Sequence, residues 1–103
     1  MMDFKKTTLT QNNTYIDILK EMQDEINELK VKYQFVITNR NRENVLSVLL
    51  DCVAVDAEMD IFQKIFEYNL FDILSAIYYT KIAQDFKDIK AQISALLEEK
   101  EVK

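Results

Sequence analysis

The chain contains neither glycine nor proline in 103 residues, and this absence limits its fold more than any other feature. Glycine is the usual residue at left-handed backbone corners, and proline is common in tight turns. A chain without either residue is poorly suited to the many hairpins of a β-sheet protein. We therefore expect a few long elements joined by turns in which asparagine takes the left-handed position. The candidates are Asn39, Asn41 and Asn69.

Length and composition indicate one folded domain. A chain of 103 residues can bury one modest core but not two. Hydrophobic residues make up 49% of the chain and charged residues 30%, a mixture typical of globular proteins and not of disordered ones. We expect a flexible lead at residues 1–13, a single helical domain at residues 14–100 and a charged tail at residues 101–103.

Two stretches carry apolar residues in alternating steps of three and four, which is the heptad spacing of a helix that buries one narrow stripe. We call these stripes the first seam and the last seam. The first seam consists of Tyr15, Leu19, Met22, Ile26, Leu29, Tyr33 and Val36. The last seam consists of Tyr79, Ile82, Phe86, Ile89, Ile93 and Leu96.

Polar residues near each seam predict where the helices begin. Thr14, with Asp17 three residues later, has the spacing of a capping box, so the first helix is predicted to begin there. Asn69 and Asp72 repeat this pattern before the last helix. Residues 33–38, "YQFVIT", are rich in β-formers, and the sequence leaves open whether they end the first helix or form a short strand.

The middle of the chain, residues 45–57, is apolar nearly all round, which predicts neighbours on most sides and a place at the centre of the core. This pattern indicates an all-α antiparallel bundle of three to four helices whose first and last helices are coiled-coil-like. A last helix over residues 70–98 would be about 43 Å long, whereas a compact chain of this length has a radius of gyration of about 13 Å. We therefore expect the terminal helices to protrude or to pair in a homodimer, unless the two seams pack on each other within one chain.

The net charge is −5, and the excess of negative charge lies in the middle of the chain. Residues 43–80 contain seven acidic residues and one basic residue, whereas both flanking parts are nearly balanced. Such a surface disfavours direct contact with nucleic-acid phosphates and favours a protein partner with a basic surface.

Four of these acids lie in "VDAEMDIFQKIFE", residues 55–67, which invites comparison with a calcium-binding loop. The acids occupy the first, third, fifth and twelfth positions of an EF-hand-like spacing, but Ile61 stands where the loop needs glycine. At helical spacing three of the acids share one polar face, and Glu58 falls on the apolar side. We predict no metal site here. The predicted partner-binding residues are Asp56, Glu58, Asp60 and Glu67.

A second acidic stretch, "EMQDEINELK", contains Asp24, Glu25 and Glu28. These residues resemble the E-E-x-x-E element of all-α nucleotide pyrophosphohydrolases of the MazG type, and the resemblance implies helix-borne carboxylates that hold magnesium against a triphosphate. It covers about ten residues. The family expects E-x-x-D on the next helix, but Leu46 and Val48 stand where an aspartate and a glutamate belong.

Other chemistry has few residues to support it. There is no histidine to act as general base or metal ligand, and no glycine for a phosphate-binding loop. Cys52 is the single cysteine, so no internal disulfide can form. The densest apolar run is shorter than the ~20 residues of a membrane span. The N-terminal lysines are not followed by an apolar stretch as long as that of a signal peptide. We expect a cytoplasmic protein that is not an enzyme, uses no cofactor and contacts no membrane.

The expected function is that of a protein-binding regulator or inhibitor that presents an acidic helical surface to a basic partner. The bias toward lysine and isoleucine is typical of AT-rich coding sequences, which indicates a low-GC bacterium or its phage. A phage or mobile-element protein that acts on nucleic-acid-processing machinery would fit these properties. The alternatives are a phage-type assembly, scaffold or chaperone protein with coiled-coil helices, and a MazG-like hydrolase.

Overall fold

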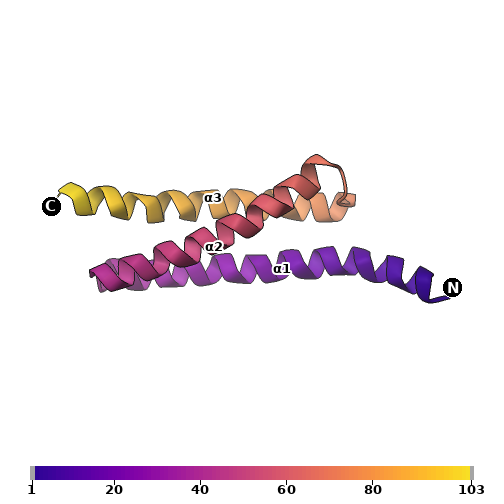
Figure 1. Ribbon diagram of the computed structural model, residues 1–103, viewed down its shortest axis with the longest axis horizontal. Helices are drawn as coiled ribbons and strands as arrows, with labels where there is room; N and C mark the ends of the chain where they lie inside the picture. The colour runs from indigo at the N-terminus through magenta and orange to yellow at the C-terminus, as the bar shows by residue number, and fades with distance from the viewer. Residues whose placement is uncertain (1, 103) are drawn as a thin grey trace.

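The computed structural model describes the backbone of residues 2–102 and the side chains of residues 15–98. The chain forms three helices, α1 (Met2–Thr38), α2 (Arg42–Glu67) and α3 (Ile73–Val102). The three helices lie side by side, and α2 runs antiparallel to both α1 and α3 (Figure 1). The prediction of an all-helical bundle is confirmed. A fourth helix, the upper end of the predicted range, is not found in residues 2–102.

The start of α1 differs from the prediction. Because α1 begins at Met2, the backbone of Thr14 lies inside the helix, and the predicted helix start at Thr14 is wrong. No proline interrupts the preceding residues, so nothing in the backbone chemistry stops the helix from continuing toward the N-terminus. The flexible lead predicted at residues 1–13 and the charged tail predicted at residues 101–103 lie in segments whose side chains are outside the described ones, and both stay predictions.

Residues 33–38 are helical, so the strand alternative for this segment is wrong. The turn that follows contains two of the predicted asparagines, but neither Asn39 nor Asn41 has the predicted left-handed conformation, since Asn69 is the residue with a positive φ in the described part of the chain. The amide of Asn39 donates to the carbonyl of Phe35 at 2.8 Å and so continues the helical hydrogen bonding past the last residue of α1. Asn41, in an extended conformation, accepts a hydrogen bond from the amide of Asn44 at 2.8 Å and caps the N-terminus of α2.

The second turn also depends on asparagine, which takes the predicted left-handed position but is not the predicted cap of the last helix. Asn69 has a φ of 60°, which is the left-handed conformation. The amide of Asn69 donates to Phe66, and that of Leu70 donates to Ile65, the two bonds of a Schellman motif. The predicted start of the last helix at Asn69 is therefore one turn early. Asp72 caps α3 instead, accepting from the amide of Ser75 at 2.7 Å.

The core lies between the three helices. The first and last seams supply most of it: Tyr15 and Tyr33 are half-buried, and the other residues of both seams are buried. The buried face of α2 repeats the same steps of three and four residues. It consists of Val45, Val48, Cys52, Val55, Met59 and Phe62.

The prediction that α2 has neighbours on most sides is wrong. Leu46, Leu50 and Val53 are 53%, 60% and 64% exposed, although they lie in the most apolar part of the chain. In a bundle of three helices each helix has two neighbours, and together these cover only one side of it. Without a fourth helix on the bundle, the outward face of α2 remains at the surface.

The bundle is elongated. Its principal dimensions are 63 × 22 × 16 Å, and its radius of gyration is 16.9 Å, against about 13 Å for a compact chain of this length. The first part of α1 extends beyond the α2–α3 turn at one end, and the last part of α3 extends beyond the α1–α2 turn at the other (Figure 1). The predicted protrusion of the terminal helices is thus observed. A search of the described helices finds none with the length and apolar character needed to span a membrane.

Candidate acidic protein-binding groove

The stretch "VDAEMDIFQKIFE" lies within α2 and is helical throughout. It therefore cannot adopt the turn of a calcium loop, and the helical interpretation is correct. The helix continues without a break through Glu58. A kink does not explain why this carboxylate lies outside the polar face of α2.

The other three predicted acids lie on the side of α2 that faces α3. Asp56 pairs with Lys90 of α3, with 3.2 Å between Oδ1 and Nζ. Asp56 and Asp60 line a recess between the two helices together with Lys87 and Lys90. Glu67 accepts a hydrogen bond from Gln63 at 2.9 Å. Lysines of α3 thus offset much of the negative charge that the sequence assigned to this face.

Glu58 lies on the opposite side of α2, against α1. It lines a recess with Glu21 and Glu25, whose apolar part includes the partly exposed side chains of Ile18 and Ile61. The structure thus separates the predicted site residues into two groups. Glu58 lies with glutamates of α1, Asp56 and Asp60 lie with lysines of α3, and Glu67 is bonded to Gln63 on the same side of α2.

Beside the recess that contains Glu58 lies another between α1 and α2, of about 530 Å³, and Glu25 lines both of them. It adds Glu28, Lys32 and Asp51 to the polar lining. We call the two recesses together the acidic groove. Its charged lining consists of Glu21, Glu25, Glu28, Lys32, Asp51 and Glu58.

The acidic groove carries five carboxylates and one amine, and that amine is already engaged, because Lys32 pairs with Asp51 across the α1–α2 interface. The remaining carboxylates lack such compensation from the groove itself. Partial burial and the neighbouring carboxylate of Glu58 together raise the pKa of Glu25 above its usual 4.5, and Glu28 and Glu21 add to this effect. The groove is therefore a region of concentrated negative potential.

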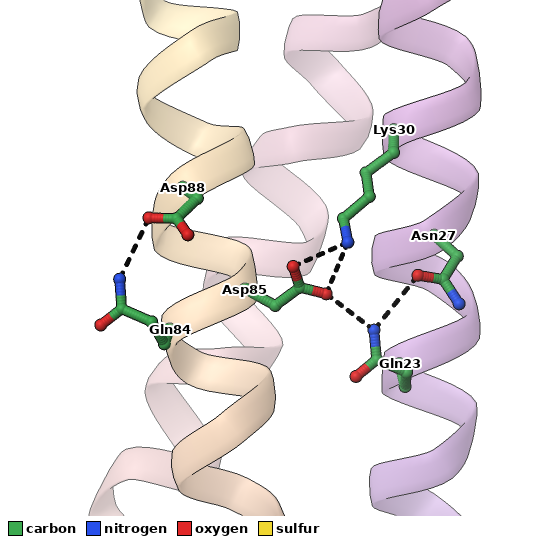
Figure 2. Close-up of polar contacts among 6 residues, drawn as sticks. All are labelled: Gln23, Asn27, Lys30, Gln84, Asp85 and Asp88. Carbon is green, nitrogen blue, oxygen red and sulfur yellow. Dashed lines mark hydrogen bonds and ion pairs between the residues drawn. The ribbon is translucent and has the colours of Figure 1, made fainter.

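The interface between α1 and α3 is different, because there a carboxylate is neutralised (Figure 2). Lys30 of α1 contacts both carboxylate oxygens of Asp85 on α3, at 2.7 and 2.8 Å, and Gln23 donates to one of them at 2.9 Å. The hydrogen bond from Lys30 is the main reason that the pKa of Asp85 lies below its usual 3.8. This cluster fixes α1 against α3 and leaves no unpaired charge for a partner.

The residues behind the hydrolase resemblance do not assemble into a metal site. Glu25 and Glu28 line the acidic groove, whereas Asp24 is exposed and is absent from its lining. Of the two positions where the family expects acids, Val48 is fully buried and Leu46 faces outward. Among the described residues no three acidic, histidine or cysteine side chains are placed to hold a metal ion.

Cys52 is buried in the core, as its apolar surroundings predicted. Desolvation raises the pKa of its thiol above 9.0, so the reactive thiolate is disfavoured at neutral pH. The residue is a packing element in this fold.

Comparison of the chain with protein-family models, curated proteins and solved structures finds no match in any of the three. The site is therefore interpreted from its own geometry.

Sequence reasoning missed the groove because its acids come from two helices. Glu25 and Glu58 are far apart in the chain, and their contact depends on how α1 crosses α2. The available signal was Glu58 itself, the one acid of its stretch that did not fit the polar face.

Proposed function

We propose that the chain is a non-enzymatic protein-binding regulator that holds a basic segment of a partner protein in the acidic groove. The observation that carries this proposal is the charge of the groove, five carboxylates against one lysine that is already paired with Asp51. Burial and, after it, the like charge of Glu58 raise the pKa of Glu25, and a lysine or arginine placed between the two glutamates would remove the second of these effects.

The apolar part of the groove narrows the class of partner. Ile18 is 37% exposed and Ile61 60% exposed beside the glutamates. Because acidic and apolar side chains line the same groove, it favours an amphipathic segment that combines basic and apolar side chains. Basic surfaces of this kind are common on proteins that bind nucleic acid, so inhibition of a nucleic-acid-processing protein by occupation of its basic site is the form of regulation we propose.

The test uses a labelled amphipathic helical peptide rich in lysine and arginine, titrated with the full chain at several salt concentrations. We expect binding that weakens as salt is added, because the contacts are between exposed charges. The double substitution Glu25→Gln with Glu58→Gln should weaken binding about tenfold or more and reduce the dependence on salt.

The matched control is the opposite face of α2, where Asp56→Asn, Asp60→Asn and Glu67→Gln remove three acids that the sequence had placed at the site. We expect these substitutions to leave peptide binding nearly unchanged, because the three acids lie outside the acidic groove and lysines of α3 already lie beside Asp56 and Asp60. If only this triple variant loses binding, the basic partner binds at the three acids and not in the acidic groove. Peptide binding that both variants leave intact, with the same salt dependence, would contradict the proposal.

A second candidate function, self-assembly, is favoured by a separate observation. Several large apolar side chains of α2 are more than half exposed on the face that points away from the core.

A further inference from the structure

The outward face of α2 carries a second apolar stripe. At helical spacing its centre lies about half a turn from the centre of the buried face. Leu46, Leu50, Val53 and Ile61 are each at least 53% exposed, and two exposed alanines lie among them. We call this set the outer stripe. It consists of Leu46, Leu50, Val53, Ala54, Ala57 and Ile61.

The outer stripe is symmetrical about the midpoint between Val53 and Ala54. Leu46 and Ile61 lie at equal distances from that midpoint, and so do Leu50 and Ala57. If a second copy of α2 lies antiparallel on the first, the central large residues of the stripe face alanines, and Leu46 faces the partner's Ile61 at each end. Leu50 meets the partner's Ala57, and Val53 meets the partner's Ala54. The alanines allow the two helices to approach closely, and the large residues fill the space beside them.

The charges at the ends of the stripe follow the same symmetry. Glu43 lies beyond one end and Lys64 beyond the other, again at equal distances from the midpoint. Both are exposed and continue the outward face of α2. An antiparallel pair places Glu43 of each copy opposite the partner's Lys64, whereas a parallel pair would place like charges together. This charge complementarity selects the antiparallel arrangement.

We propose that the outer stripe is the contact surface of a homodimer in which the α2 helices of two copies pack antiparallel about a twofold axis. The axis passes between Val53 and Ala54, and two Glu43–Lys64 pairs close the ends of the interface. Such a contact is isologous, so it closes on itself and leaves no free stripe. The segment from Glu43 to Lys64 is about 32 Å long and one helix wide, which places the interface at the small end of stable ones and the dissociation constant in the micromolar range.

The proposal goes beyond the proposed function, because it concerns the outward face of α2 and does not use the charged residues of the acidic groove. Ile61 and Ala54 lie where the two surfaces adjoin, since both also line the groove. The substitution Glu58→Gln should alter binding of a basic peptide and leave the dimer unchanged. The two proposals can thus fail separately.

Sedimentation equilibrium of the full chain tests the dimer. We expect a monomer–dimer equilibrium with a dissociation constant of about 1 to 100 µM. Leu50→Asp buries two symmetry-related carboxylates in the interface, so it should raise the dissociation constant at least about 100-fold. Leu50 is 60% exposed in one copy, so the variant should keep the helical circular dichroism and melting temperature of the monomer. A chain that is monomeric at about 1 mM would overturn the proposal.

The control for position is Ile77→Asp, on a second exposed apolar patch at the start of α3, where Ile77 is 51% exposed. We expect this variant to dimerise like the parent chain. A dimer that Ile77→Asp dissociates and Leu50→Asp does not would place the interface on α3 and overturn the proposal.

Charge reversal tests the antiparallel register. Glu43→Lys and Lys64→Glu each convert two attractive pairs into repulsive ones, so each should raise the dissociation constant about tenfold. The double variant restores opposite charges and should recover parental affinity. Glu43→Lys lowers the net negative charge of the chain and Lys64→Glu increases it, so weakening by both cannot come from net charge. Single variants that both dimerise like the parent, or a double variant that is weaker than either single one, would refute the antiparallel register.

Discussion

Among individual residues, two carboxylates have pKa values that the bundle shifts in opposite directions. Glu25 faces Glu58 across α1 and α2, and its pKa is raised by burial and by that like charge. Asp85 faces Lys30 across α1 and α3, and its pKa is lowered by the hydrogen bond from that amine. Asp85 is therefore a residue whose ionised form stabilises the fold, whereas Glu25 is one whose ionised form is disfavoured in it.

The contribution of Asp85 predicts a dependence of stability on pH. Because its folded-state pKa lies below 3.8, the stabilisation is present above pH 3.8 and is lost as the pH falls below 3.8 and through the folded-state pKa. Asp85→Asn should lower the free energy of unfolding at pH 7 by about 0.5 to 1 kcal/mol. This difference from the parent chain should shrink as the pH falls through that range.

Urea denaturation at several pH values measures this difference. The matched control is Asp88→Asn, since Asp88 lies one turn away on α3 and, among residues 15–98, accepts a hydrogen bond only from Gln84 of the same helix (Figure 2). The control should change stability little at any pH. An equal effect of the two substitutions would show that the ion pair with Lys30 is not the cause.

At the scale of the element, the turns show how a chain without glycine ends a helix. The left-handed residue after α2 is Asn69, with a φ of 60°. This conformation brings the amides of Asn69 and Leu70 onto the last carbonyls of α2. Asparagine has a Cβ and so carries part of the steric cost that glycine avoids, but less than alanine does.

A pair of substitutions at Asn69 tests this account. Asn69→Ala should lower the free energy of unfolding by about 1 kcal/mol, because alanine resists a positive φ. Asn69→Gly should leave it unchanged or raise it slightly, since glycine adopts this conformation without steric cost. Thermal and urea unfolding of the two variants at one pH provide the measurement. Equal stability of the two variants would contradict a role for backbone conformation at this turn.

In the molecule as a whole, the three helices share one narrow core that runs along the elongated bundle. Ile93 lies on the last seam of α3 and is fully buried. The substitution Ile93→Ala should cost about 2 to 5 kcal/mol, because it removes buried methylene groups and leaves a cavity. Since each helix depends on the other two to cover its apolar face, all three helices of the variant should unfold together in a single transition.

Leu97→Ala, on the same helix but with a side chain 44% exposed, is the control and should cost clearly less. Coincident unfolding curves from far-ultraviolet circular dichroism and from tyrosine fluorescence would support one cooperative unit. A variant in which the tyrosine signal is lost well before the helical signal would contradict it.

The helical class, the residues of the first and last seams, and the presence of asparagine in both turns could be predicted from the sequence alone. The reason is that heptad spacing, capping and left-handed tolerance depend on residues close together in the chain. The tertiary structure decided which apolar face of α2 is buried, since both of its faces are apolar and only the position of α1 and α3 distinguishes them. It also decided that Glu58 lies against Glu25, because a contact between helices depends on their crossing and not on the periodicity of either one.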